Sequence, residues 1–308
     1  MNQRSLAFTY SIIFIVMIIW GLNIVFLKLL VNNFPTATMT SFRIMLAGVV
    51  NFSIVLFSRQ MRKMTKKEWI YILLGTGLGV TGHHTFLAQG LVTTEASSTV
   101  LILALLPVTT FLLAVAFLGD RLTKWRLTGI FLAFIGVVFI QGGGSVGIKI
   151  GELYIFLAMI MQAISFVFIK KASQTVDAKQ ITALMLLIGS GGLLVISLMI
   201  EPQGISQMIG APLYLYILFF VSSILATAVG HLVFNAAIQR IGAGQAAIFN
   251  NFVPFFGLVS SALFLEENIY WYQYFGFIFI VLGVLFGSGY IENVWMKSKP
   301  IYRKEGDL

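Results

Sequence analysis

Charged residues and cysteine are the features that this sequence has least of. Lysine, arginine, aspartate and glutamate together make up 10% of the 308 residues, whereas a soluble domain carries about 25%. Hydrophobic residues make up 58%, and a chain of this length cannot hide so much apolar surface from water. The same composition excludes a disordered chain, which would be polar and poor in aromatic residues. The absence of cysteine excludes disulfide bonds, thiol nucleophiles and thiolate metal sites.

Long apolar runs indicate an integral membrane protein built from helices. A helix needs about 20 apolar residues to cross a bilayer, and the runs here lack the polar–apolar alternation of an outer-membrane barrel. The first run is too long for a signal peptide, so we interpret it as the first span. We predict an all-α membrane protein with ten transmembrane helices, at residues 8–30, 36–57, 69–91, 95–118, 125–141, 152–170, 180–200, 213–237, 243–265 and 271–290.

Basic residues lie almost entirely on one side of this predicted topology. If the N-terminus is cytoplasmic, the inner segments hold seventeen lysine and arginine residues and the outer segments hold two, Lys28 and Lys149. Positively charged loops remain in the cytoplasm, so we predict a multi-pass protein of the cytoplasmic (inner) membrane with both termini inside. The net charge of +9 then reflects topology, and no nucleic-acid partner is expected.

The second half of the sequence repeats the first. Moving the first half by 147 positions places His84 on His231, and a shift of 142 places the run at 20–28 on the run at 162–170. Each unit has five predicted spans, and an odd number gives the two units opposite orientations in the membrane. We therefore expect two inverted-topology five-helix repeats followed by a basic cytoplasmic tail, at 1–145, 146–291 and 292–308.

Several short motifs follow one another in a fixed order along the first half, and the later part of this pattern is repeated in the second half. They are Trp20-Gly21-Leu22-Asn23, Pro35, Arg43, Ala96-Ser97-Ser98, Pro107 and Gly119-Asp120-Arg121-Leu122-Thr123, then Gly242-Ala243-Gly244, Pro254 and Leu265-Glu266-Glu267. In this order they resemble the drug/metabolite transporter (DMT) superfamily, EamA-type. The resemblance implies ten spans in two five-helix units and the carriage of small metabolites, often outward, but it names no substrate. Asp120 stands where the family usually has glutamate, and because both are acidic we expect little consequence.

Arg43 is the one charged side chain that is predicted to lie deep within a span. Every aspartate and glutamate within the predicted spans or beside them falls near a span end, so the guanidinium has no acid at its own depth. A buried guanidinium needs an anion or several hydrogen-bond acceptors. Three kinds of partner stay open: an end-lying acid such as Glu95, backbone carbonyls, or an anionic group of a substrate.

Two histidines occupy matched positions, His84 in the third and His231 in the eighth predicted span. Thr227, His231 and Asn235 are spaced four residues apart, so they would share one face of a helix. Each histidine either packs between helices through hydrogen bonds or contacts a substrate. Since no carboxylate lies at depth, coupling to protons would need His84 or His231, or would be absent.

Further candidates are the polar residues at the centre of the matched runs. Trp20 and Asn23 share a face of the first span, and Gln162 and Ser165 are their counterparts in the sixth. Such residues either bond neighbouring helices or line a cavity between the repeats. The sequence does not decide between these two roles.

Pro107 and Pro254 are predicted to lie in the middle of the fourth and ninth spans. A proline in a helix interior frees the carbonyl four residues earlier, here at Leu103 and Asn250. A freed carbonyl at membrane depth either accompanies a plain kink or lines a cavity. Asn250 therefore joins the candidate site.

Transport is the function that these features support best. We predict a secondary transporter that moves amino acids or related neutral, zwitterionic or anionic metabolites, with export expected, by alternating access at a central cavity. A lipid-handling or regulatory membrane protein on the same fold is the alternative. The predicted substrate-binding residues are Trp20, Asn23, Arg43, His84, Gln162, Ser165, Thr227, His231, Asn235 and Asn250.

An enzyme is not expected, because the sequence has no G-x-S-x-G or H-E-x-x-H motif and no carboxylate pair at depth. No cofactor and no metal site are predicted. The expected partners are a small-molecule substrate and the lipid bilayer, with protons as a further partner if the histidines carry them. Whether the chain is a monomer or a homodimer stays open.

Overall fold

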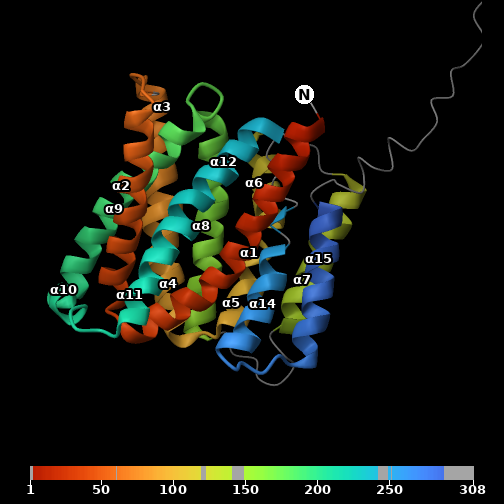
Figure 1. Cartoon of the computed structure of the whole chain (residues 1–308). Coiled ribbons are helices and arrows are strands. Elements are labelled where there is room, and N and C mark those ends of the chain that lie inside the picture. Colours follow the sequence, from red (N-terminus) through yellow and green to blue (C-terminus); the bar gives the residue numbers. More distant parts are fainter. Residues whose placement is uncertain are drawn as a thin grey trace, which may run out of the picture.

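A computed structural model describes the chain at residues 3–59, 61–118, 123–140, 149–241, 249–250 and 252–287. Over these residues the regular structure is entirely helical (Figure 1), which confirms the predicted class. The elements are the α-helices and two π-helical segments α1 (Gln3–Asn33), α2 (Thr36–Phe57), α3 (Lys66–Thr76), η1 (Gly77–Gly82), α4 (His83–Thr93), α5 (Ala96–Leu103), α6 (Leu106–Leu118), α7 (Lys124–Ile140), α8 (Ile150–Ala172), α9 (Ala178–Ile200), α10 (Gly204–Gln207), α11 (Leu213–Val221), η2 (Ser222–Val229), α12 (Gly230–Ile241), α14 (Phe252–Phe264) and α15 (Trp271–Gly287).

Some of the sequence motifs lie outside the described residues. They are Gly119-Asp120-Arg121-Leu122, Gly242-Ala243-Gly244, and the basic tail at 292–308. The expectations for Asp120 and for the tail therefore stay predictions.

Five helical stretches are long and apolar enough to cross a bilayer: Phe8–Asn33, Thr36–Phe57, Ile150–Ala172, Ala178–Ile200 and Leu213–Ala237. They coincide with the first, second, sixth, seventh and eighth predicted spans. Shorter apolar helices lie at Ala96–Thr110, Leu127–Gly136, Phe252–Phe264 and Trp271–Gly283. The fold is therefore that of an all-helical, multi-pass membrane protein, and the full count of ten spans stays a prediction.

The two prolines predicted for helix interiors lie instead near the start of a helix. The predicted fourth span is divided at Ala104–Leu105, and Pro107 is the second residue of α6. Pro254 is likewise the third residue of α14. In a first turn the missing N–H of proline costs nothing, because that group has no partner within the helix. At Pro107, a plain kink within a continuous helix, one of the two alternatives, is therefore replaced by a break between α5 and α6. Residue 251, just before α14, lies outside the described residues, and the structure places Pro254 in the first turn of that helix.

The two π-helical segments interrupt the predicted third and eighth spans at matching places. η1 ends at Gly82, two residues before His84, and η2 ends at Val229, two residues before His231. A π-helical turn shifts the backbone hydrogen bonds by one residue, and such turns are frequent at functional sites. The sequence repeat thus coincides with a repeated irregularity of the backbone.

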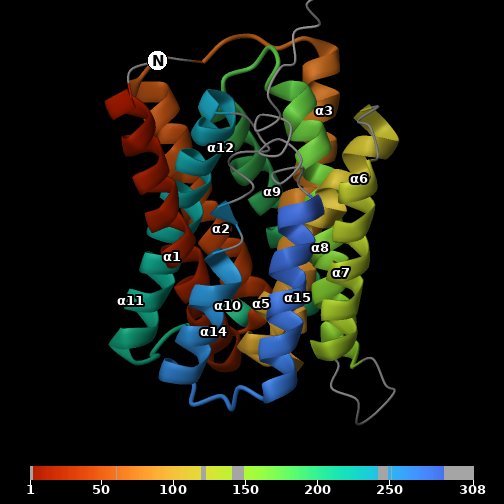
Figure 2. The same ribbon diagram turned by 90° about the vertical axis from the view of Figure 1, so that its right-hand side faces the viewer.

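Helices of the first half of the chain pack mainly against helices of the second half. α2 lies along α9, α7 along α15, and α1 along α14 (Figure 2), while α4 packs against α8. Gly48 permits the first of these contacts, because a Cβ atom there would lie 2.8 Å from the backbone nitrogen of Leu187. The interior of the protein is therefore formed where the two halves meet.

Large apolar side chains cover much of the outside of the bundle. Phe57 is 90% exposed and Met199 is 78% exposed, and both belong to helices long enough to span a membrane. A water-facing surface of this kind would promote aggregation, whereas lipid tails solvate it without cost. The exposed surface therefore supports the membrane assignment that the helix lengths give.

Candidate functional site

A cavity of about 140 Å³ lies between the two halves of the chain. Its walls come from α1, α2, α4, α8 and η2, from the ends of α5, α6 and α12, and from α14 with Asn250 just before it. Eight of the ten predicted site residues line it: Trp20, Asn23, Arg43, His84, Gln162, Thr227, His231 and Asn250. A larger hollow of about 400 Å³ between α1 and α12 is lined mainly by aliphatic side chains, so we take the first cavity, where polar groups converge, as the candidate site.

Arg43 is buried in the wall of this cavity, with 2% of its surface exposed. Its Nη1 donates a hydrogen bond to Oγ1 of Thr227 at 2.7 Å, and its Nη2 lies 3.4 Å from Nδ1 of His84. A guanidinium can only donate, so Nδ1 of His84 accepts and the imidazole is neutral in this contact. Glu95, the acid that the sequence offered as a partner, makes no ion pair with Arg43: over the described part of the chain, the ion pair present is Arg62–Glu68.

The other two histidines orient their rings through backbone carbonyls. Nδ1 of His83 lies 2.9 Å from the carbonyl of Ala158, and Nδ1 of His231 lies 3.0 Å from the carbonyl of Thr227. Because a carbonyl oxygen only accepts, Nδ1 carries the proton in both rings. In a neutral ring this leaves Nε2 as a hydrogen-bond acceptor. His83 lines the cavity as well, although the sequence-based candidate set did not include it.

Side chains from α1 and α2 hold the irregular backbone of η2 in place. Nε1 of Trp20 donates to the carbonyl of Ala226 at 2.8 Å, and Nδ2 of Asn51 donates to that of Ala228 at 3.1 Å. Oδ1 of Asn23 accepts a hydrogen bond from the hydroxyl of Ser222 at 2.6 Å. Trp20 and Asn23 therefore have both of the roles that the sequence allowed, because each bonds to a neighbouring helix and each lines the cavity.

Ser165 and Asn235 are the two candidates that do not line this cavity. The hydroxyl of Ser165 donates to the carbonyl of Gly75 at 2.8 Å, which joins α8 to α3. Nδ2 of Asn235 donates to Oγ1 of Thr182 at 2.7 Å, and Asn235 lines a smaller hollow of about 40 Å³ that shares Gln162 with the first. Their hydrogen bonds give both residues a role in helix packing.

Apolar residues form the rest of the cavity wall, and the sequence analysis did not identify them. They include Ile24, Leu27, Leu87, Val100, Leu103 and Phe166. An apolar residue in a membrane helix is indistinguishable by type from one that faces lipid or one that packs between helices. The rotation of each helix decides between these positions, and it is set by packing that no local pattern reveals.

Lys28 offers a smaller correction near the end of α1. In the predicted topology Lys28 is among the basic residues of the outer segments, and a lysine at a span end can extend to lipid headgroups. In the structure its Nζ donates to the carbonyls of Leu91 at 2.7 Å and Thr94 at 2.9 Å. These carbonyls lie at the C-terminal end of α4, where an ammonium group favourably completes the helix. Lys28 therefore ties α1 to α4 and does not reach the cavity.

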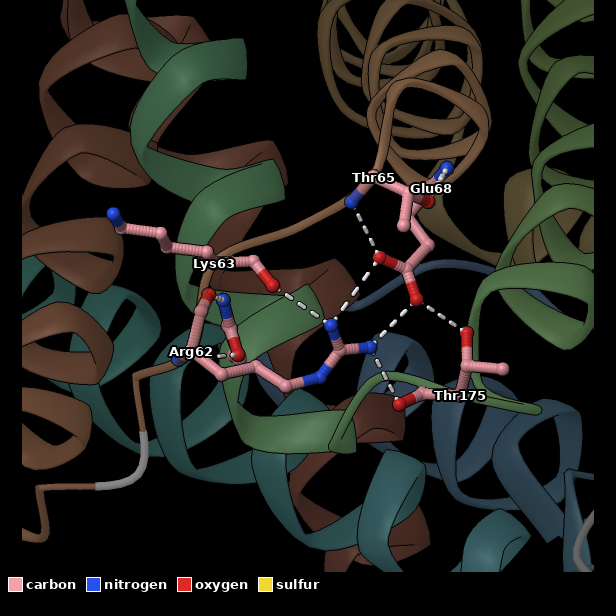
Figure 3. Close-up of polar contacts among 6 residues, drawn as sticks. Arg62, Lys63, Thr65, Glu68 and Thr175 are labelled. Atoms are coloured by element: carbon pink, nitrogen blue, oxygen red, sulfur yellow. Dashed lines mark hydrogen bonds and ion pairs between the residues drawn. The ribbon is translucent and has the colours of Figure 1, made fainter.

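A second polar cluster lies at the end of the bundle that holds the N-terminus and the start of α3 (Figure 1). Figure 3 shows Arg62 directed between Glu68 and Thr175; its Nη2 lies 2.6 Å from Oε1 of Glu68 and donates to the carbonyl of Thr175 at 2.6 Å. The hydroxyl of Thr175 donates to the same carboxylate at 2.6 Å, and the backbone N–H of Thr65 donates to it at 2.8 Å. These donors, with Arg62 the strongest, lower the pKa of Glu68 to about 2.

This cluster, defined as Arg62, Thr65, Glu68, Thr175 and Gln180, is named the inner cluster after the predicted topology, in which this end faces the cytoplasm. It joins the two halves of the chain. Gln180 exchanges two hydrogen bonds with the backbone of Arg62, at 3.3 Å and 2.8 Å. The segment before α3 is thereby fastened to the start of α9 through Gln180, and to the segment between α8 and α9 through Thr175. The sequence analysis used these charges only for topology, although the spacing of Thr65 and Glu68 is the signature of a capping box, which the structure contains.

Two carboxylates join the halves at the opposite end of the bundle. Glu201, just after α9, accepts hydrogen bonds from the backbone N–H groups of Ala37 at 3.1 Å and Thr38 at 2.8 Å in α2. Glu267, after α14, accepts from the N–H groups of Ala96 and Ser97 at the start of α5, at 2.8 Å and 2.9 Å. A carboxylate satisfies the free N–H groups of a helix start and interacts favourably with its dipole. Both ends are therefore bridged by side chains of one half bound to the other.

Known proteins resemble this chain over most of its length. The model of the EamA-like transporter family matches residues 7–142 and 149–288. The uncharacterized transporter YyaM of Bacillus subtilis (strain 168) is 30% identical over 275 residues, covering 86% of this chain and 88% of that protein. A probable amino-acid metabolite efflux pump of Escherichia coli (strain K12) is 26% identical over 280 residues, covering 88% of this chain and 91% of that protein.

A solved crystal structure aligns with a TM-score of 0.69 and 14% identity, covering 92% of this chain and 97% of that one. At this identity the likeness concerns the fold alone. The family model, in contrast, matches nearly the whole chain in two successive segments. The chain therefore belongs to the EamA-like transporter family.

Proposed function

We propose that this protein is a secondary transporter that moves small metabolites across the cytoplasmic membrane by alternating access at the central cavity. In this proposal ten spans form two inverted five-helix repeats, both termini are cytoplasmic, and the direction is export. The observation that carries it is the convergence of eight polar or aromatic candidates from both halves of the chain on one buried cavity. Membrane carriers bind their substrates at such a meeting point of repeats.

The bridges at the two ends of the bundle support this mechanism. The inner cluster joins the halves because Arg62 and Glu68 of the first half bond to Thr175 and Gln180 of the second. Glu201 and Glu267 join the halves at the other end. Alternating access requires the halves to separate at one end while they stay in contact at the other. We propose that the inner cluster opens when the cavity faces the cytoplasm, and that the two carboxylate caps open when it faces outward.

The substrate class follows from the kinds of side chain around the cavity. Among the described residues, the lining includes one lysine or arginine and no acidic side chain, so neutral, zwitterionic or anionic metabolites fit better than cations. The printed name of one relative, a probable amino-acid metabolite efflux pump, is consistent with amino acids or related compounds. If transport is coupled to protons, His83, His84 and His231 are the titratable groups within reach of the cavity.

Counterflow in proteoliposomes tests this function. Vesicles holding the purified protein are loaded with one unlabelled compound from a panel of amino acids, organic acids and nucleosides, and the uptake of the same labelled compound is measured. We expect accelerated exchange for members of the first two classes relative to vesicles without protein. If no compound of the panel exchanges, the transport proposal is wrong, and the alternative of a lipid-handling or regulatory protein takes its place.

A matched pair of variants connects the transport to this cavity. Val253 lines the cavity, whereas Val259 on the same helix is 43% exposed on the outside. Val253→Trp would fill a space of about 140 Å³ and abolish exchange, whereas Val259→Trp would leave it near the wild-type rate. Equal exchange by the two variants would show that the transport path lies elsewhere.

A further inference from the structure

The hydrogen bonding of Arg43 is incomplete in the protein alone. Its guanidinium has five N–H donors, and the contacts of the described structure supply two acceptors, Thr227 and His84. The Nε atom is buried and has no partner within the described residues. A buried donor without an acceptor is rare in proteins and calls for an explanation.

The charge of Arg43 is uncompensated as well as its hydrogen bonding. Thr227 and His84 are neutral acceptors, and within the described ranges the only ion pair joins Arg62 to Glu68. Holding an unpaired charge away from water is costly, and a bound anion would remove that cost. Arg43 is the only lysine or arginine among the residues that line the cavity, so a single negative charge balances it. A carboxylate matches both the charge and the planar fork of the guanidinium.

Away from Arg43, the cavity is lined mainly by neutral polar and apolar side chains. Its other polar residues include the neutral side chains of Asn23, Gln162 and Asn250, and no aspartate or glutamate lines the wall in the part of the chain that the structure describes. Oδ1 of Asn23 already accepts a hydrogen bond from Ser222. An ammonium group would therefore find neutral acceptors and no counter-charge. The apolar wall of Ile24, Leu27, Leu87, Val100, Leu103 and Phe166 suits a hydrocarbon body.

We infer that the cavity selects monocarboxylates with a compact apolar body, that the carboxylate binds the guanidinium of Arg43, and that an amino group on the substrate is dispensable. This inference rests on the proposed function and specifies its substrate class. A volume of about 140 Å³ is close to that of an engineered cavity of about 150 Å³ that binds benzene in another protein. Branched-chain and similar small acids therefore fit.

Four compounds that share one hydrocarbon body test the inference: leucine, its keto acid, leucinamide and isopentylamine. The first two carry a carboxylate, and the last two do not. We expect the two acids to undergo counterflow in proteoliposomes, and leucinamide and isopentylamine to exchange at least about a hundredfold more slowly, because a site built for one polar group rejects analogues that lack it. Exchange of leucinamide at the rate of leucine would overturn the carboxylate assignment.

Variants of Arg43 separate recognition from a structural role. In Arg43→Gln, the ratio of keto-acid to leucinamide exchange should fall toward one, and Arg43→Lys should retain part of the preference because it retains the charge. Arg240, which donates to Thr9 near the other end of the α1–α12 contact, provides the control, and Arg240→Gln should keep the wild-type ratio. A merely structural Arg43 would lower all rates together and leave the ratio unchanged, which would contradict the inference.

Thermal shifts of the wild-type protein give the same ranking without any variant. The keto acid and leucine should raise the Tm, because a ligand that binds the folded state stabilises it, and leucinamide and isopentylamine should not. Equal shifts for all four compounds would overturn the inference while transport stands. If the acids alone raise the Tm but nothing in the wider panel exchanges, the carboxylate site is upheld and the transport proposal fails.

Discussion

The central cavity and the inner cluster each contain an arginine, and they surround its charge in opposite ways. Arg62 is bound by a carboxylate, two backbone carbonyls and Gln180, and its side chain is 43% exposed. Arg43 is 2% exposed, has two neutral acceptors, and has no partner for its Nε among the residues that the structure describes. Arg62, which is more accessible to solvent, is thus paired with a carboxylate of the protein. Arg43, which is more deeply buried, has neither an ionic partner nor a full set of hydrogen-bond acceptors among the described residues.

This difference distinguishes a charge that serves the structure, at Arg62, from a charge that can bind a substrate, at Arg43. At the inner cluster the partners of Arg62 come from the protein, so the contact can serve to close that end. In the cavity wall, Asn23 bonds to Ser222, and His83 and His231 bond to backbone carbonyls. A partner from outside the chain would complete Arg43, and this is the property that a substrate site requires. The comparison therefore predicts different consequences for the same substitution at the two positions.

The largest expected effect is on transport. Arg43→Gln should reduce the initial exchange of the keto acid of leucine by about a hundredfold, because the carboxylate would lose its charged, hydrogen-bonded partner. Arg62→Gln should change the same rate by less than about fivefold, since the pair that it breaks is partly exposed and screened. Initial rates in proteoliposomes of equal protein content measure both. A larger loss in Arg62→Gln than in Arg43→Gln would invert the comparison.

Thermal stability should depend more on the inner cluster than on Arg43, and the expected changes are smaller than those in transport rate. Glu68→Gln should lower the Tm of the ligand-free protein by several degrees, because Arg62, Thr175 and Thr65 all donate to that carboxylate. Arg43→Gln should change the Tm little, since removing an unpaired buried charge offsets the loss of its two hydrogen bonds. Thermal unfolding in detergent compares them. A collapse of the Tm in Arg43→Gln alone would show that this arginine is chiefly structural.

The pH dependence of that stability follows from the lowered pKa of Glu68. Folding lowers this pKa from 4.5 to about 2, so the contribution of Glu68 is fully present above the unfolded value and is lost as the pH falls through the folded one. The difference in Tm between wild type and Glu68→Gln should stay constant from neutral pH to about 5. It should then shrink as the pH falls from 4.5 toward 2. A difference that already shrinks near neutrality would show that another group controls the cluster.

Much of the architecture could be predicted from the sequence because membrane insertion depends on local composition. The apolar runs of the sequence predict the five long spans to within a few residues. The matched histidines mark the places where the two π-helical segments lie, but nothing in the sequence indicates that the helix is irregular there. η1 contains three glycines whereas η2 contains none, so no shared residue pattern marks the π-helical turn. The prolines were recognised, but whether a proline bends a helix or begins one depends on the residues packed around it.

The polar residues of the site could be predicted from the sequence, but the contacts that they make with one another could not. Arg43, His84 and Thr227 were chosen because polar groups at membrane depth are costly, and the structure brings the three together. Their mutual contacts join residues up to 184 positions apart, so only the packing of whole helices reveals them. The pair of Arg62 and Glu68 is a different case, because its residues are only six positions apart. Their contact is local, and yet the sequence-based interpretation treats both residues only as charges near a span end.

The smallest expected effect concerns Trp20, in the wall of the central cavity. Trp20→Phe removes the hydrogen bond from Nε1 to the carbonyl of Ala226 and retains most of the ring that lies 5.3 Å from the ring of His231. A lost hydrogen bond of this kind costs about 1 kcal/mol of unfolding free energy, measurable by reversible unfolding in mixed micelles. Because Arg43 is untouched, the preference for the keto acid over leucinamide should persist in this variant. A Trp20→Phe protein that keeps its stability but loses this preference would move the centre of recognition from Arg43 to the tryptophan.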